Sequence, residues 1–442
     1  MSRMRLLLVF VGLLLTPLWS LPARALDIQE VASPSGIKAW LIQDSTAPVI
    51  SLSFAFEGGA ALDPAGKDGA SRMMAALLDE GAGPYDSAAF QAEVEAVAAR
   101  LSFSADADYV TGSLRTLSDK RERAFELLRL AISEPRFAEA DVERIRSQML
   151  SNLRSSATSP NWIAGRTLTE TLFQKHPYAR PSDGSFDTVP NIKIEDLRAV
   201  HKRVFVRGGL TVAVVGDITP EELARLLDRA FDSVPAGAPQ QRVAEWNGPP
   251  PGRTIVLERD FPQSVVMLAR QGLKRDDPDW FPAFLMNYIL GGGGFNSRLT
   301  EEIREKRGLA YGVSTALQAY AAGGIYIGSV ATANARVGQS IDLIKQEMVR
   351  LAEGGVTAQE LANAKTYVAG SFALNFSSSG AIASILLTVQ LDKLGRDYFD
   401  RRNALIEQVT QEDIKRVAKR LLDPKDFVVV VVGQPAGVKS SE

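Results

Sequence analysis

The sequence predicts an α+β protein made of two homologous modules, each a mostly antiparallel sheet with helices packed on it. Three observations support this fold class. Strand and helix patterns are mixed in both halves of the chain, a helix followed by a strand recurs late in each half, and a proline-rich stretch separates the two copies. The 442 residues, of which 45% are hydrophobic, are enough to form more than one hydrophobic core.

The recurring segment is the clearest sign of a repeat. Residues 194–205 and 411–422 both have the spacing of an amphipathic helix and a similar order of charged residues. Each leads through a short polar turn into a run of buried-type strand that ends in glycine, at Gly216 and at Gly433. We therefore predict two related modules of about 200 residues each.

The other elements follow the same order in both halves, with strands first and helices afterwards. The first half begins with a strand pattern at 50–56 and has an alternating one at 109–114, whereas the second half begins with strands at 255–257 and 265–268. The helical patterns of the first half are at 87–101, 120–133 and 141–155. This order favours helices packed on a sheet, built twice.

The N-terminus has the pattern of a secretory signal peptide. Two arginines precede the apolar run 6–15, and Ala23-Arg24-Ala25 supplies a small-residue cleavage pattern. The alternative is a membrane anchor, but the apolar run is shorter than the roughly 20 residues that span a bilayer. We expect an exported mature chain without a membrane segment, located in the periplasm on the assumption of a Gram-negative source.

Composition sets the remaining boundaries. The connecting stretch has a linker composition and includes three consecutive prolines at 249–251. We predict a signal peptide at 1–25, a first module at 26–240, a linker at 241–252 and a second module at 253–442. The formal net charge of −2 shows no basic excess for binding nucleic acid.

Metal-binding side chains are scarce. The chain has no cysteine, which excludes disulfides and thiolate metal sites, and its only histidines are His176 and His201. His176 precedes a proline in a loop and His201 lies on the polar side of a predicted helix. We interpret both as surface or capping residues, because a zinc site needs several convergent ligands.

The second half contains a more specific pattern, in which residues 290–299 read LGGGGFNSRL and 303–311 read IREKRGLAY. This string resembles the signature of the C-terminal half of the pitrilysin, insulinase and mitochondrial processing peptidase family. Gly58-Gly59, the Gly-Lys-Asp-Gly turn at 66–69 and His176-Pro177-Tyr178 fall in the order of the family as well. The resemblance implies that the two modules form half of a clamshell chamber for peptides.

Active members of that family bind zinc through an H-x-x-E-H motif on the helix after this turn, plus a glutamate on a later helix. Two histidines one helical turn apart converge on the metal, and the glutamate between them polarises its water. Here the ligand positions fall on Arg72 and Ala76, the general-base position on Ala75, and the distal glutamate on Asn152 and its neighbour. The resemblance therefore implies a degenerate zinc site without a metal, where Arg72 either fills the former metal space or is a solvated helix arginine.

Arg304 and Tyr311 match the arginine and tyrosine that active members use from their second half to hold the substrate. A guanidinium and a phenol both donate hydrogen bonds, which suits them to gripping a peptide carbonyl or an oxyanion. We predict a helix at 297–306 that ends near Gly308, with Arg304 in its last turn and Tyr311 at the start of the next strand. The alternative is that Arg304 complements the helix dipole and Tyr311 packs as an ordinary strand aromatic.

These residues imply a non-catalytic subunit of a two-chain peptidase. A zinc-bearing H-x-x-E-H homologue would supply the metal, and this chain would supply the substrate-binding Arg304 and Tyr311 for an unfolded peptide. A non-enzymatic peptide-binding clamp or assembly scaffold remains as the alternative. The glycine run 291–294 lacks the lysine of a phosphate-binding loop, and we interpret it as a flexible or close-approach segment near the chamber entrance.

Overall fold

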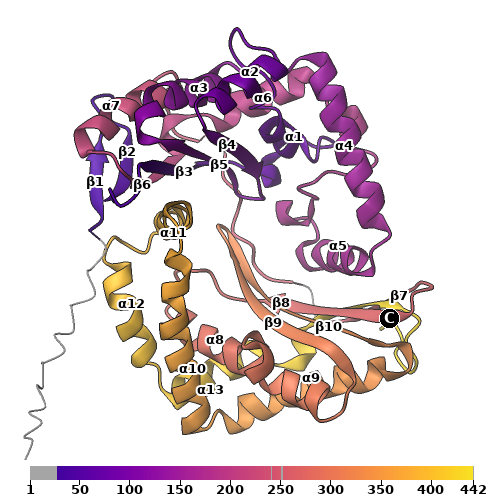
Figure 1. Ribbon diagram of the computed structural model, residues 1–442. Helices are drawn as coiled ribbons and strands as arrows, with labels where there is room; N and C mark the ends of the chain where they lie inside the picture. The colour runs from indigo at the N-terminus through magenta and orange to yellow at the C-terminus, as the bar shows by residue number, and fades with distance from the viewer. Residues whose placement is uncertain (1–26, 240, 250–251, 442) are drawn as a thin grey trace, which may run out of the picture.

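The computed structural model describes residues 27–239, 241–249 and 252–441. The predicted signal peptide therefore lies outside the described residues. Two layers of β-sheet face each other, and most helices cover the outer face of one sheet or the other (Figure 1). None of the helices in these three ranges is long and apolar enough to cross a bilayer.

Both sheets are mainly antiparallel and have the same strand order. The first sheet runs β1-β2-β6-β3-β5-β4 and the second runs β7-β11-β8-β10-β9. Apart from β1, the strands correspond one to one, and in each sheet one pair, β2 with β6 or β7 with β11, is parallel. The strands are Gln29–Ala32 (β1), Lys38–Gln43 (β2), Val49–Glu57 (β3), Arg100–Ala105 (β4), Tyr109–Leu117 (β5), Leu210–Gly216 (β6), Thr254–Glu258 (β7), Gln263–Gln271 (β8), Ala310–Tyr320 (β9), Gly323–Ala333 (β10) and Val428–Gly433 (β11). The predicted α+β fold with two homologous sheets is confirmed.

The two strand-ending glycines occupy equivalent places in the repeat. Gly216 pairs with the end of β2 and Gly433 with the end of β7, and their φ angles are +146° and +149°. A Cβ atom would lie 2.1 Å from the Val49 carbonyl oxygen at Gly216 and 2.3 Å from the Ser264 hydroxyl at Gly433. Only glycine fits both the backbone angle and the space, which explains why both copies end in this residue.

Thirteen α-helices lie in the described part of the chain. They are Ala70–Ala76 (α1), Ser87–Ala96 (α2), Arg121–Ser133 (α3), Glu139–Ala157 (α4), Pro160–Phe173 (α5), Ile194–Val204 (α6), Pro220–Phe231 (α7), Trp280–Asn287 (α8), Val337–Gly354 (α9), Ala358–Ser371 (α10), Ser379–Leu391 (α11), Tyr398–Glu407 (α12) and Gln411–Leu421 (α13). The helices expected at 120–133 and 141–155, and the repeated pair α6 and α13, are confirmed within a few residues.

The helix predicted at 87–101 is wrong in its last part. It ends at Ala96, Ala98 has a φ of +48°, and Leu101 belongs to strand β4. Residues 100–104 of β4 alternate between exposed and half-buried, and the half-buried Leu101 and Phe103 pack against the core of the first half. Pairing with β5 therefore overrides a helical spacing that the apolar residues of this segment also satisfy.

Each half also covers the sheet of the other half. Helix α5 from the first half packs on the second sheet, where Leu168 belongs to one apolar cluster with Val430. Helix α11 from the second half packs on the first sheet, where Leu386 joins Val215. Both helices lie between the two layers in Figure 1. Because the apolar faces are exchanged, the two halves hold each other in place.

Candidate functional site

Helix α1, on which the resemblance places the zinc motif, is fixed at its start by a buried carboxylate. Asp63 accepts hydrogen bonds from the backbone nitrogens of Gly69, at 3.0 Å, and Ser71, at 3.1 Å. Nη2 of Arg203, on α6, lies 3.6 Å from the same carboxylate. The carboxylate thus caps the helix where its amides would otherwise be unpaired, and it neutralises a mostly buried guanidinium.

The four positions to which the resemblance assigns the zinc site carry no histidine, cysteine or carboxylate. Arg72 is exposed, and its Nη1 lies 3.4 Å from Oδ1 of Asp183, which supports the interpretation of a solvated helix arginine. Ala75 is buried in the core, Ala76 is half-buried, and Asn152 is exposed on α4. Among the residues that the structure describes, no group of three or more His, Cys, Asp or Glu side chains could hold a metal. The side chains of this site therefore do not fit zinc.

Both histidines have a structural role. Nδ1 of His176 accepts a hydrogen bond from the Tyr178 amide, at 3.3 Å, where a short helical turn begins. Nε2 of His201 lies 2.6 Å from the carbonyl oxygen of Ile132, in the last turn of α3. Burial lowers the pKa of His201, so it remains neutral near pH 7. These contacts agree with the interpretation of both histidines as capping residues, and both side chains are half-buried.

Arg304 and Tyr311 lie together in the second half, with Phe295 as a third member. The guanidinium carbon of Arg304 is 4.7 Å from the centre of the Tyr311 ring and 4.5 Å from that of Phe295. The guanidinium of Arg304 therefore contacts both rings. Tyr311 is 85% exposed and Phe295 is 70% exposed. An ordinary packed strand aromatic would be covered, so the exposure of Tyr311 argues against that alternative.

The environment of Arg304 differs from that of the other arginines of the same segment. Arg298 makes a two-pronged ion pair with Glu360, and Arg307 pairs with Glu302 at 2.5 Å. Among the described residues, the one ion pair of Arg304 is with its own neighbour Glu305, with 3.4 Å between Nε and the carboxylate. Within the described residues, neither Nη atom of Arg304 hydrogen-bonds to another residue. Its outer N–H groups can therefore bind a carbonyl or carboxylate from outside the chain.

The backbone around this cluster is unusual. Tyr288–Gly292 and Thr300–Glu305 are both π-helical, a rare conformation that is frequent at functional sites. The helix predicted at 297–306 is therefore shorter and wider than expected. Its end before Gly308, which has a φ of +57°, and the position of Tyr311 as the second residue of β9 agree with the prediction.

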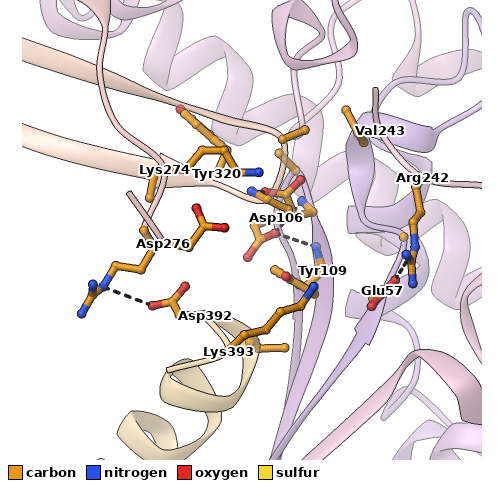
Figure 2. Close-up of a pocket in the computed structure, with 18 of the residues that line it drawn as sticks. Glu57, Asp106, Tyr109, Arg242, Val243, Lys274, Asp276, Tyr320, Asp392 and Lys393 are labelled. Carbon is orange, nitrogen blue, oxygen red and sulfur yellow. Dashed lines mark hydrogen bonds and ion pairs between the residues drawn. The ribbon is translucent and has the colours of Figure 1, made fainter. Parts of the chain in front are cut away.

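A separate cavity of about 580 Å³ lies at the seam between the halves. Figure 2 shows Asp106 and Tyr109 on one side of it and Asp276 and Asp392 on the other. Burial and four nearby carboxylates raise the pKa of Tyr109, so its phenol stays neutral. The cavity walls also contain two ion pairs that tie residues 241–245 to both halves, Arg242 with Glu57 at 3.2 Å and Lys274 with Glu245 at 2.8 Å.

Two segments of the chain match sequence models of one family. Residues 38–184 match the model described as Insulinase (Peptidase family M16), and residues 191–368 match the one described as Peptidase M16 inactive domain. This chain belongs to peptidase family M16. The resemblance expected from the second-half signature is thereby confirmed, and the chain is a member of M16 without the H-x-x-E-H motif.

The M16 chain is similar to relatives of two kinds. It is 27% identical over 363 residues to the non-peptidase homolog YmxG of Helicobacter pylori, covering 82% of this chain and 83% of that one. It is 24% identical to the probable mitochondrial-processing peptidase subunit beta of Schizosaccharomyces pombe, covering 86% of each. A crystal structure of a peptidase M16 inactive domain from Pseudomonas fluorescens superposes with a TM-score of 0.88 at 29% identity, covering 94% of this chain and 100% of that one.

The sequence analysis did not predict that Phe295 lies beside Arg304 and Tyr311. Its ring meets Arg304 although the two residues are nine positions apart and separated by a bend at Ser297. The available signal was an aromatic residue directly after a glycine run, which often marks a close approach of the backbone. The glycine run is such a segment, because a Cβ atom at Gly292 would lie 2.4 Å from the Asn287 side chain.

The ion pair that anchors this segment to α10 gives a prediction for the pH dependence of stability. Hydrogen bonds from Arg298 lower the pKa of Glu360 from 4.5 to about 2. Glu360→Gln should lower the free energy of unfolding by about 1–2 kcal/mol at pH 7. Because the folded pKa lies below the unfolded one, this difference is complete above about pH 5 and is lost as the pH falls from 4.5 towards 2. Urea unfolding of the wild type and of Glu360→Gln at pH 7, 4 and 3 measures this difference in the free energy of unfolding. An equal difference at all three pH values would contradict the lowered pKa of Glu360.

Proposed function

We propose that this M16 chain is the non-catalytic subunit of an exported, periplasmic, heterodimeric zinc metallopeptidase. Its partner is a zinc-bearing H-x-x-E-H homologue, and its substrate is an unfolded peptide. The observation that carries the proposal is Arg304, whose guanidinium lies over two exposed rings and whose Nη atoms hydrogen-bond to no other residue in the described part of the chain. The lack of zinc ligands at Arg72 and Ala76 supports a separate source for the metal.

The two chains divide the chemistry between them. The partner supplies the zinc, its ligands and the general base, whereas this chain supplies hydrogen-bond donors. The Arg304 guanidinium and the Tyr311 hydroxyl grip a substrate carbonyl and stabilise the negative charge that its oxygen gains during attack. The guanidinium donates through its N–H groups and the phenol through its O–H group.

Reconstitution tests the proposal. The mature chain, a candidate H-x-x-E-H homologue and their mixture are each assayed on a fluorogenic unfolded peptide, with and without a chelator. Only the mixture should cleave the peptide, and the chelator should stop it. Zinc-dependent cleavage by this chain alone would overturn the proposal. Peptide binding by this chain with no cleavage in the mixture would favour the non-enzymatic clamp or scaffold.

The Tyr311 hydroxyl can be tested separately from its ring. Tyr311→Phe keeps the ring beside Arg304 and removes one donor, so kcat of the complex should fall about tenfold with little change in KM. Tyr367→Phe is the matched control, because Tyr367 is also an exposed tyrosine of the second half, stacked instead on Tyr288. A kcat that is equal in the two variants would refute a donor role for Tyr311.

A further inference from the structure

Phe295 is a large apolar side chain that the fold leaves in solvent. It lies in the short helical turn Gly294–Asn296 and is 70% exposed. The turn is closed by hydrogen bonds, because the Asn296 amide donates to Gly293 and the Ser297 hydroxyl donates to the Gly294 carbonyl at 2.8 Å. A phenylalanine held outward by a closed turn is not explained by core packing.

The backbone before Phe295 is also held in place. A Cβ atom at Gly291 would lie 2.6 Å from the Thr315 hydroxyl, so the run packs directly on strand β9. The Thr315 hydroxyl in turn donates to the Asn287 side chain at 2.8 Å. These contacts fix the turn to the strand that carries Tyr311. Phe295 and Tyr311 therefore belong to elements that are in direct contact, and Arg304 contacts both rings.

The stack has two physical consequences. Both rings contact the guanidinium, which restricts its rotation, and its Nη atoms hydrogen-bond to no other described residue, so they can bind a ligand. The outer face of Phe295 is apolar and exposed, so it can contact an apolar side chain of a peptide whose carbonyl is bound by Arg304. Burial of such a side chain is favourable, whereas a small or charged one gains little there.

We propose that Phe295 is a positioning residue for Arg304 and a specificity residue that selects peptides with a large apolar side chain beside the bound carbonyl. This inference rests on the proposed function for its effect on cleavage. It adds a role for a residue of the glycine-rich turn and a substrate class, a peptide with Phe, Tyr, Leu or Met at one defined position. The inference also predicts that this chain alone binds such a peptide, whether or not the peptide is then cleaved.

The experiment compares two peptides that differ only by Phe or Ala at one position, chosen by scanning that substitution along the peptide. In the reconstituted complex, the wild type should favour the Phe peptide about fivefold to tenfold in kcat/KM. Phe295→Ala should remove this preference and lower kcat about fivefold on both peptides. Phe295→Tyr should restore both properties, whereas Phe295→Leu should keep the preference but not kcat. Phe186→Ala, which removes another exposed phenylalanine in the first half, should change neither.

A binding measurement separates the two proposals. Fluorescence anisotropy of the labelled Phe peptide with this chain alone should show weaker binding to Phe295→Ala than to the wild type, and circular dichroism should show that the fold is kept. If no mixture cleaves peptides but this difference in binding is found, the proposed function fails and the role of Phe295 in selection stands. If the complex cleaves and Phe295→Ala retains wild-type kcat and preference, the inference on Phe295 is overturned.

Discussion

Replacing Arg304 with alanine should lower kcat of the reconstituted complex about 100-fold, the effect expected when one preorganised donor to an oxyanion is removed. The change in KM should be smaller, because the donor is needed most when charge develops on the substrate oxygen. Arg304 is suited to this role because two exposed rings hold its guanidinium while its outer N–H groups remain available. Steady-state kinetics on a fluorogenic peptide measure both constants.

Two further variants test whether the fall in kcat is specific to the guanidinium of Arg304. Arg307→Ala removes an arginine from the same segment that is paired with Glu302, so it should leave kcat within about twofold of the wild type. Arg304→Lys retains the charge but not the planar group that contacts both rings, and it should recover only part of kcat. Light scattering shows whether each variant still assembles with its partner. An assembled Arg304→Ala complex with wild-type kcat would refute the donor role.

Asp63→Ala should destabilise the chain by about 4 kcal/mol, the largest effect on stability that we expect from one substitution. The carboxylate is buried, caps the amides of Gly69 and Ser71, and lies 3.6 Å from the guanidinium of Arg203. Its removal leaves a buried cation and the first amides of α1 without this partner. Urea unfolding followed by circular dichroism measures the loss.

Two controls separate this buried network from ordinary surface charges. Asp183→Ala removes the exposed carboxylate that pairs with Arg72 of α1. This substitution should lower the free energy of unfolding by about 0.5 kcal/mol or less. Asp63→Asn keeps an oxygen that can accept from Gly69 and Ser71, so its cost should be smaller than that of alanine. Equal losses for Asp63→Ala and Asp183→Ala would show that the cap and the buried pair contribute little.

Local patterns predicted much of this fold correctly. The amphipathic helices α6 and α13 and the strands that follow them were recognisable because each is set by the spacing of its own apolar residues. The end of α2 was not recognisable from the sequence, because the spacing of residues 97–101 fits a helix as well as a strand. Pairing of β4 with β5, a tertiary contact, decides between the two. The exchange of α5 and α11 between the sheets was equally beyond local pattern, since it depends on which apolar faces meet.

The sequence by itself determined that this chain repeats one α+β module and that its zinc motif is lost. Both conclusions depend only on which residues stand at known spacings, and an alanine at a ligand position cannot bind a metal in any conformation. Only the tertiary structure decided which of the basic residues near the glycine run is free to act. Arg298 and Arg307 are neutralised by carboxylates, Glu360 from a distant helix and Glu302 five residues away. Arg304 instead contacts two exposed rings, and this difference is a property of three-dimensional contacts rather than of residue type.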